Sequence, residues 1–174
     1  YRSMAPEVLD EGALAWLQGH LWILSGLHGC LRPLDAVMPY RLEMGARLSM
    51  PSRADGSPVA ARNLYEFWGD AIARRIADEP GGVTVVNLAS VEYADAVLPR
   101  LGDEAAVVTC IFGEGLRAGK PVQRSTASKA ARGSMVRWMA EHGVTEPDGL
   151  AGFDVGYALD EGLSEPGRLV FMRR

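Results

Sequence analysis

The sequence predicts a domain that mixes α-helices with β-strands. Amphipathic helical segments alternate along the chain with short apolar runs, and proline, glycine and serine mark the turns between them. Of the 174 residues, 48% are hydrophobic and 23% are charged, which is typical of globular proteins and excludes disorder, collagen and coiled coil. No apolar run approaches the ~18–20 residues that span a bilayer. This length suits one domain, so we expect a single domain over residues 1–174.

The first third of the chain contains one clear helix and one short strand. Asp10 is placed to cap a helix over residues 11–20, because its side chain can accept a hydrogen bond from the first helical turn. The apolar run 21–24 then predicts a buried strand. Two prolines break regular pairing in residues 28–44, and composition predicts a loop over residues 51–60.

The most regular helical pattern covers residues 64–78, with Asn63 as its cap. Apolar side chains at a spacing of four form one stripe on this helix, made of Leu64, Trp68, Ile72 and Ile76. Gly69 lies inside the pattern, where glycine costs about 1 kcal/mol relative to alanine. We therefore expect a close contact at Gly69 that a larger side chain would prevent.

An apolar strand over residues 83–87 runs directly into a helix that Ser90 caps. The free N–H groups and the dipole at the start of a helix attract anions. The junction of Asn87 and Ser90 therefore either binds an anion, or Ser90 serves only as a cap. Further strands are expected at residues 105–112, 157–159 and 169–171, the last two as a hairpin.

A long helix starts at Thr126 or Ser128 and ends at Glu141. A tight glycine turn then leads into a short helix near residues 146–151. Two helices joined in this way resemble a helix-hairpin-helix, which binds phosphate backbones, although many αα-corners share the pattern.

The strongest charge feature is a basic segment over residues 116–140. It contains no acidic residue and carries a net charge of +6, whereas the rest of the chain carries −10. Lys129 and Arg132 lie three residues apart on one helix face, where like charges repel. Either a bound anion or acidic residues from elsewhere in the chain would offset this repulsion. Gly133 beside them would let a backbone approach a phosphate closely.

A second set of candidate site residues is polar and of mixed charge. The candidates for an acid–base site are Arg32, Asp35, Arg41, Glu43, Asp70, Asn87, Ser90, Tyr93 and Lys129. If they converge in one cleft, a carboxylate or Lys129 would carry a proton while the arginines hold an anion. The alternative is that the loop charges only form local ion pairs, Arg32 with Asp35 and Arg41 with Glu43.

Cysteine and histidine spacing predicts no metal site. Cys30 and Cys110 are far apart and lack CxxC spacing, and the three histidines form no ligand pair on one helix. We expect two reduced thiols in a cytosolic protein, no metal ligand set and no cofactor.

Several longer segments together resemble one family. In chain order they are YRSMAP (1–6), LSGLHGCLRPLD (24–35), PYRLEMGARL (39–48), NLYEFWGD (63–70), VVNLAS with EY (85–93) and SKAARGSMVRWMAE (128–141). The combination of RPLD, PYRLEM, FWGD and NLAS is specific, and the match extends to the final apolar strand. On these motifs the chain resembles the YaaA family of peroxide stress proteins. Two residues depart from the family pattern: Trp22 replaces an arginine, and Cys30 replaces an aliphatic residue.

The resemblance implies an unusual α+β fold, with a mixed sheet, surrounding helices, a positively charged cleft and a helix-hairpin-helix element near the C-terminus. It also implies a cytoplasmic protein that responds to hydrogen peroxide stress, limits free intracellular iron and binds duplex or distorted DNA. Family members carry a further N-terminal portion before the position of Tyr1. Residues 1–174 are therefore expected to be the C-terminal body of a longer protein.

Two functions from different classes remain open. The first is DNA binding, in which the cations Lys120, Arg124, Lys129, Arg132 and Arg137 contact the phosphate backbone. The second is an enzyme that acts on a small anionic or nucleobase-like substrate in a polar cleft built from the RPLD, PYRLEM, NLAS and KAARG segments. The expected partner is DNA or a small anionic ligand, and no membrane.

Overall fold

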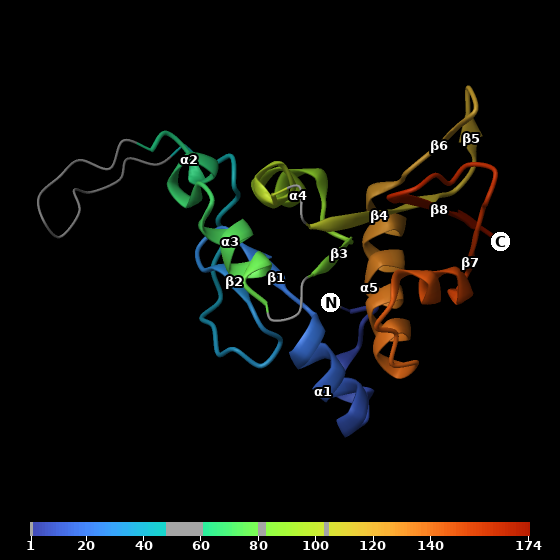
Figure 1. The fold of residues 1–174 in the computed structure, drawn as a ribbon, viewed down its shortest axis with the longest axis horizontal. Coiled ribbons are helices and arrows are strands. Elements are labelled where there is room, and N and C mark those ends of the chain that lie inside the picture. The colour runs from blue at the N-terminus through green and yellow to red at the C-terminus, as the bar shows by residue number, and fades with distance from the viewer. Residues whose placement is uncertain (1, 48–60, 80–82, 103–104) are drawn as a thin grey trace, which may run out of the picture. The chain divides into compact units, whose positions relative to one another are not determined.

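The computed structural model describes residues 2–47, 61–79, 83–102 and 105–174. The chain forms two units (Figure 1). Unit 1 comprises Tyr1–Leu21, Thr84–Leu88 and Ala106–Arg174, and unit 2 comprises Trp22–Val83 and Ala89–Ala105. Helices and strands occur in both, which confirms the α+β class. A single domain over the whole chain stays a prediction, and the predicted loop at 51–60 lies outside the described residues.

Unit 1 is built on a four-stranded mixed sheet. Its strands, in order across the sheet, are β3 (Thr84–Asn87), β4 (Ala106–Gly113), β8 (Arg168–Arg173) and β7 (Tyr157–Leu159). β3 and β8 pair parallel to β4, and β7 pairs antiparallel to β8. The predicted hairpin of the last two strands is confirmed. Gly167 takes a φ of +76° in its turn, a conformation that favours glycine.

Two helices pack together in unit 1. They are α1 (Glu11–His20), which follows the 3-10 helix η1 (Pro6–Val8), and α5 (Ser125–Glu141). Asp10 caps α1 as predicted, because its carboxylate accepts the Ala13 N–H at 2.8 Å. α5 lies alongside β4 (Figure 1) and buries one apolar face, formed mainly by Ala131, Met135, Trp138 and Met139.

Aromatic side chains form the centre of the unit 1 core. Phe112 of β4 stacks on Phe171 of β8 with ring centroids 5.5 Å apart. Phe153 and Tyr157 meet the Phe112 ring edge-on, at 6.1 and 5.5 Å. Stacked and edge-to-face pairs of this kind add stability beyond their buried area. This core therefore ties β4, β7 and β8 together and presents a surface on which α5 packs.

Two short elements flank α5. Before it, β5 (Leu116–Arg117) and β6 (Lys120–Pro121) form a hairpin whose turn residues Ala118 and Gly119 both have positive φ, as a tight two-residue turn requires. After it comes η3 (Pro147–Gly152), a 3-10 helix. The short helix predicted near 146–151 is present, but it is not an α-helix.

Unit 2 combines a small hairpin with short helices. Its elements are β1 (Ile23–Ser25), β2 (Gly29–Leu31), α2 (Leu64–Trp68), α3 (Ala71–Ala77), α4 (Val91–Val97) and the 3-10 helix η2 (Leu98–Arg100). β1 and β2 pair antiparallel. The prediction that residues 28–44 are irregular missed β2. The Gly29 backbone, at a φ of +75°, allows the chain to reverse there, and the Trp68 ring lies within 3.0 Å of where a Cβ would be.

The helix predicted over residues 64–78 is two helices, α2 and α3, which separate at Gly69. That residue adopts φ +47° and ψ −125°, which a helix cannot contain. The close contact expected at Gly69 is wrong, because a Cβ there would meet no atom within 4 Å. Glycine is required for the backbone conformation, which lets the apolar stripe continue into α3, where Ile72 and Ile76 are buried.

The aromatic core makes a testable stability prediction. Phe112→Ala should lower the free energy of unfolding by about 3–5 kcal/mol, because Phe112 is 1% exposed and its removal leaves a cavity. Urea unfolding followed by far-ultraviolet circular dichroism measures the change. Leu116→Ala, at a 57% exposed side chain of the β5–β6 hairpin, is the control and should change stability by less than about 0.5 kcal/mol. Equal losses in the two variants would contradict this account of the core.

Candidate functional site

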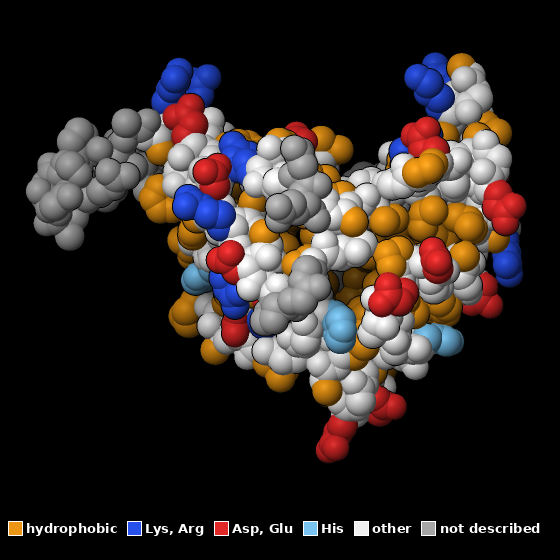
Figure 2. All heavy atoms as spheres, in the orientation of Figure 1, with side chains coloured by type: hydrophobic (Ala, Val, Ile, Leu, Met, Phe, Trp, Pro, Cys, Tyr) orange, Lys and Arg blue, Asp and Glu red, His pale blue; other side chains and the backbone are white. Residues whose placement is uncertain are grey.

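All the cations of the predicted basic segment belong to unit 1. Arg117 and Lys120 are exposed on the β5–β6 hairpin. Figure 2 shows blue side chains gathered at the tip that Figure 1 labels β5 and β6. Arg124 precedes α5, and the remaining three cations, Lys129, Arg132 and Arg137, lie on that helix.

Two of the predicted phosphate-binding arginines are engaged by neighbouring carboxylates. The Nε atom of Arg124 lies 3.4 Å from Oε2 of Glu114. The Nε–H of Arg137 donates to Oε1 of Glu141 at 2.8 Å, one helical turn away. These two positions therefore contribute less free positive charge than the sequence suggests.

Lys129 and Arg132 are different, because neither forms an ion pair with any residue that the structure describes. Lys129 is exposed, whereas Arg132 is half-buried. Burial lowers the pKa of Arg132, because desolvation disfavours its charged form. The like-charge pair predicted from the sequence is thus present on α5 without a described acidic partner, and a bound anion would stabilise it.

Gly133, next in the chain, does not play the expected part. A Cβ at this position would come within 3.1 Å of Cβ of Ser3 and 3.2 Å of the backbone nitrogen of Met4. The prediction that this glycine admits a phosphate is therefore wrong. Its missing side chain makes room for the N-terminal segment of unit 1 instead.

The corner after α5 is held by contacts within unit 1. Gly143 takes a φ of +59°, and the Val144 N–H donates to the Met139 carbonyl at 2.9 Å. His142 stacks on Trp138 with ring centroids 4.5 Å apart, and the Trp16 Nε1–H donates to the Val144 carbonyl at 3.1 Å. The corner joins α5 to the 3-10 helix η3 and not to a second α-helix.

In unit 2, Arg32 of the RPLD segment is fixed by two neighbours. Its Nη2–H donates to Oε1 of Glu79 at 2.6 Å, and its guanidinium carbon lies 3.5 Å from the centre of the Trp22 ring. Arg75 approaches the same ring at 4.7 Å. Trp22 thus provides a π-face for two cations.

The remaining loop charges of unit 2 pair locally. The Arg32 backbone N–H donates to Asp35 Oδ2 at 2.8 Å, so a hydrogen bond from the backbone closes this turn. Arg41 and Glu43 form the local ion pair predicted for them, at 3.6 Å. Because their side chains are 92% and 68% exposed, this pair contributes little to stability.

The other polar candidates are distributed over both units. Asp70 lies 3.9 Å from both Arg74 and Arg100 in unit 2. Ser90 occupies the N-cap position of α4, but its side chain makes no capping hydrogen bond, and Tyr93 lies on the same helix. Asn87 and Lys129 belong to unit 1, while the other seven acid–base candidates belong to unit 2. Convergence of this set into one cleft stays a prediction.

Sequence reasoning missed the part played by Glu92. Its carboxylate accepts the Met44 N–H at 2.9 Å, and its carbonyl accepts the Tyr65 hydroxyl at 2.9 Å. It thereby joins the PYRLEM segment, α2 and α4 within unit 2. The signal was the motif itself, because EY follows NLAS after one intervening residue, but nothing in the spacing indicated which backbone N–H Glu92 would bind.

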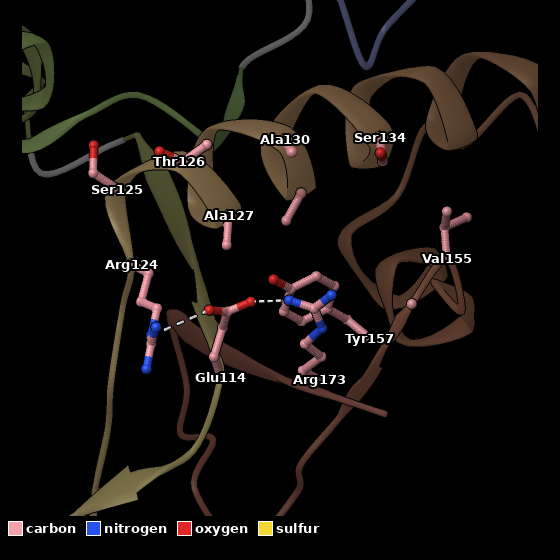
Figure 3. A pocket seen from close by; sticks show the side chains of 12 residues that line it. Glu114, Arg124, Ser125, Thr126, Ala127, Ala130, Ser134, Val155, Tyr157 and Arg173 are labelled. Carbon is pink, nitrogen blue, oxygen red and sulfur yellow. Dashed lines mark hydrogen bonds and ion pairs between the residues drawn. The ribbon is translucent and has the colours of Figure 1, made fainter.

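A pocket of about 600 Å³ lies in unit 1 at the start of α5 (Figure 3). Glu114, Arg124, Tyr157 and Arg173 give it polar groups, and small side chains of α5 line the rest. Of these four only Arg124 was predicted to be functional. Glu114 follows β4, Tyr157 lies in β7 and Arg173 lies in β8, so these residues are distant in sequence and no local motif joins them.

Comparison with known proteins identifies the family. Residues 1–163 match the family model described as peroxide stress protein YaaA. The chain belongs to the YaaA family. It is 40% identical over 174 residues to a UPF0246 protein of Lachnoclostridium phytofermentans, covering 99% of this chain and 64% of the relative. A UPF0246 protein of Albidiferax ferrireducens is 44% identical over 178 residues, covering 100% and 65%. One from Lacticaseibacillus paracasei is 41% identical over 175 residues, covering 100% and 66%.

The chain therefore spans 64–66% of the length of these curated YaaA-family relatives. In the ranges that the structure describes, no helix is long and apolar enough to cross a membrane. Among the same residues, no three His, Cys, Asp or Glu side chains gather closely enough to hold a metal ion.

Neither thiol of this YaaA-family chain has the character of a peroxide-reactive thiolate. Both cysteines are free. Burial raises the pKa of Cys110, in β4, to about 12. Burial also raises the pKa of Cys30, in β2, although Arg75 and Arg32 oppose that shift. Since the thiolate is the reactive form, both side chains resist oxidation and alkylation near neutral pH.

This predicts slow thiol labelling in the folded protein. At pH 7.5 iodoacetamide should modify Cys110 far more slowly than an unperturbed cysteine, whose pKa is about 8.5. Because its pKa lies near 12, the Cys110 rate should still rise about tenfold per pH unit between pH 8 and 10. Mass spectrometry of timed digests measures both rates, and prompt labelling of both thiols in urea is the control. A rate that levels off near pH 9 would contradict the high pKa.

Proposed function

We propose that this chain binds DNA through sequence-independent contacts to phosphates, as part of the peroxide stress response of the YaaA family. The observation that carries the proposal is the Lys129 and Arg132 pair on α5, two cations without an acidic partner among the described residues. Cations that are free of carboxylates can replace the counterions of a phosphate backbone, which is the main source of non-specific affinity.

The hairpin before α5 supports the same function. Arg117 and Lys120 are exposed on β5 and β6 and form no ion pair with the described residues. Within the acidic remainder of the chain, at −10, Glu114 and Glu141 pair with Arg124 and Arg137, while charges more than ~10 Å away are largely screened at 0.1 M salt. The net charge of −4 therefore says little about this surface.

The α5–η3 corner is the counterpart of the helix-hairpin-helix implied by the resemblance. In such motifs, backbone N–H groups at the turn hold a phosphate. Here the Gly143 and Val144 N–H groups already donate to Ala140 and Met139, at 3.3 and 2.9 Å. We therefore assign phosphate binding to the cations of α5 and give the corner only a supporting role.

The wider role is proposed for the whole protein. We infer cytoplasmic DNA protection under peroxide stress, which the two free cysteines support, because thiols stay reduced in that compartment. Limitation of free iron belongs to the same proposal. We attribute it to the complete protein.

A second candidate is an enzyme that acts on a small anionic or nucleobase-like substrate. One observation favours it: Arg41 and Glu43 of PYRLEM are exposed and engaged only with each other in the described ion pairs, so both are available to a substrate. An anion clamp and a carboxylate side by side suit acid–base chemistry. A crystal structure of the complete protein with Arg41, Glu43 and Lys129 far apart would reject this candidate.

The DNA-binding proposal predicts a change in salt dependence. Lys129→Gln with Arg132→Gln removes two phosphate contacts, so the slope of log K against log salt should fall by about 1.8. Between 50 and 200 mM salt, the double variant should lose about tenfold less affinity than the parent chain. Fluorescence anisotropy with a labelled 20-base-pair duplex of arbitrary sequence measures this.

Arg168→Gln is a single-charge control, because it removes one arginine of unit 1 that pairs with Glu165 at 2.7 Å. It should leave the slope unchanged. If the double variant binds duplex DNA with the parent's slope while it keeps its circular dichroism spectrum, α5 is not the DNA-binding element.

A further inference from the structure

The pocket at the start of α5 is bordered by three charged side chains, Glu114, Arg124 and Arg173, which we call its charged frame. The DNA contacts proposed for Lys129 and Arg132 do not explain this frame. Glu114 follows β4 and is only 12% exposed. One carboxylate oxygen pairs with Arg173 of β8, and the other lies 3.4 Å from Arg124 (Figure 3). A carboxylate that is this buried needs counter-charge. Two guanidinium groups exceed that need, so the frame keeps a net charge of +1.

Tyr157 gives the pocket a hydrogen-bond donor without a partner. The residue is 7% exposed and lines the pocket, and its hydroxyl makes no hydrogen bond to any described residue. In Figure 3 its oxygen points toward the space between α5 and Glu114. Burial raises the pKa of Tyr157, Glu114 raises it further, and Arg173 opposes the shift. The phenol is therefore protonated at neutral pH and able to donate.

The first turn of α5 adds further donors to the pocket. Ser125, Thr126 and Ala127 line it, and no side chain caps this 17-residue helix. Their backbone N–H groups make no hydrogen bond with the described residues. Uncapped N–H groups and the positive end of the helix dipole favour an anionic group at this end.

The other wall of the pocket is smooth and weakly polar. Ala127, Ala130, Ala131 and Ser134 lie along α5, and Val155 and Gly156 face them from the segment before β7. Small side chains leave a flat surface beside the helix, which suits a planar or apolar group. At about 600 Å³ the pocket has the size of small-molecule sites.

We propose that this pocket binds a small organic anion, a phosphate monoester or a carboxylate with a flat body. Its anionic group lies at the first turn of α5 beside Arg124, its body lies along the alanine face, and the Tyr157 hydroxyl donates a hydrogen bond to it. Each guanidinium has five N–H donors, so Arg124 can hold an anion and keep its contact with Glu114. The site goes beyond DNA binding, because Lys129 and Arg132 do not line it.

Four probes separate the parts of the ligand. Isothermal titration calorimetry with phenyl phosphate should show saturable one-to-one binding, and benzoate shows whether a carboxylate serves as well. Inorganic phosphate tests the charge alone, and phenol tests the ring alone. We expect each of these last two to bind at least tenfold more weakly than phenyl phosphate.

Three variants test the assigned contacts. Arg124→Gln should weaken phenyl phosphate binding about tenfold or more, and Tyr157→Phe, which removes only a hydroxyl without a described partner, about three- to tenfold. Ala130→Phe fills the pocket and should abolish binding. Arg117→Gln is the charge-matched control outside the pocket and should have no effect. The Lys129→Gln, Arg132→Gln double variant should also bind phenyl phosphate normally, whatever it does to DNA binding.

The outcomes are distinguishable. Absence of saturable phenyl phosphate binding at millimolar concentration overturns the proposal. It is also overturned if Ala130→Phe binds as the parent does, or if Arg117→Gln weakens binding as much as Arg124→Gln. Inorganic phosphate that binds as tightly as phenyl phosphate, and is insensitive to Tyr157→Phe, rejects the flat-body ligand. Failure of DNA binding with retained phenyl phosphate binding rejects the proposed function alone.

Discussion

The packing of α5 on the aromatic core is the interaction on which the rest of unit 1 depends. Met135, Trp138 and Met139 bury one face of the helix against a cluster that includes Phe112, Phe153 and Phe171. That contact fixes the rotation of the helix about its axis. Because one face of α5 is buried in the core, Lys129 is exposed and Arg132 is half-buried. For the same reason, the small residues in the first turns of α5 border the pocket.

A second constraint follows from the end of β4. The strand carries its apolar residues into the core and is followed at once by Glu114, whose side chain is 12% exposed. Leaving this carboxylate unpaired would be strongly unfavourable. Arg124 and Arg173 pair with the Glu114 carboxylate from opposite sides (Figure 3). Two guanidinium groups therefore lie beside the pocket. The pocket's charge is thus a consequence of how β4 ends.

Much of the secondary structure could be predicted because local signals decide it. Asp10 and Asn63 cap helices where the sequence indicated, with hydrogen bonds of 2.8 and 3.0 Å to the first turn. Apolar spacing indicated α5 and the strands β3, β4, β7 and β8. The errors occur where a backbone conformation overrides spacing, as at Gly69, or where a glycine turn makes a hairpin, as at Gly29. Neither glycine differs in sequence pattern from one that a helix or loop tolerates.

The candidate site residues also divide into those that local sequence signals indicate and those that only the fold brings together. The cations of α5 could be found because they are neighbours in one segment with no acidic residue. The Arg137–Glu141 pair is an i,i+4 contact within that helix, but the pairing of Arg124 with Glu114 could not be found, because it joins residues from different elements. Glu114 and Arg173 are 59 residues apart, and only the parallel pairing of β4 with β8 brings their strand ends together. Tyr157 reaches the same place through its antiparallel pairing with Arg173.

This difference is consistent with the two kinds of anion that we propose for α5. On the exposed side of α5, Lys129 forms no ion pair with a described carboxylate, so its charge is available to any phosphate. This suits sequence-independent contacts to a phosphate backbone. At its N-terminus the positive charge is already balanced in part by Glu114, so bulk attraction is weak there. Recognition at that end has to come from shape and from hydrogen bonds, the Tyr157 hydroxyl and the uncapped N–H groups among them. A pocket whose two guanidinium groups are partly balanced by Glu114, and which has unused hydrogen-bond donors, discriminates between anions by their bodies, whereas a bare cation pair does not.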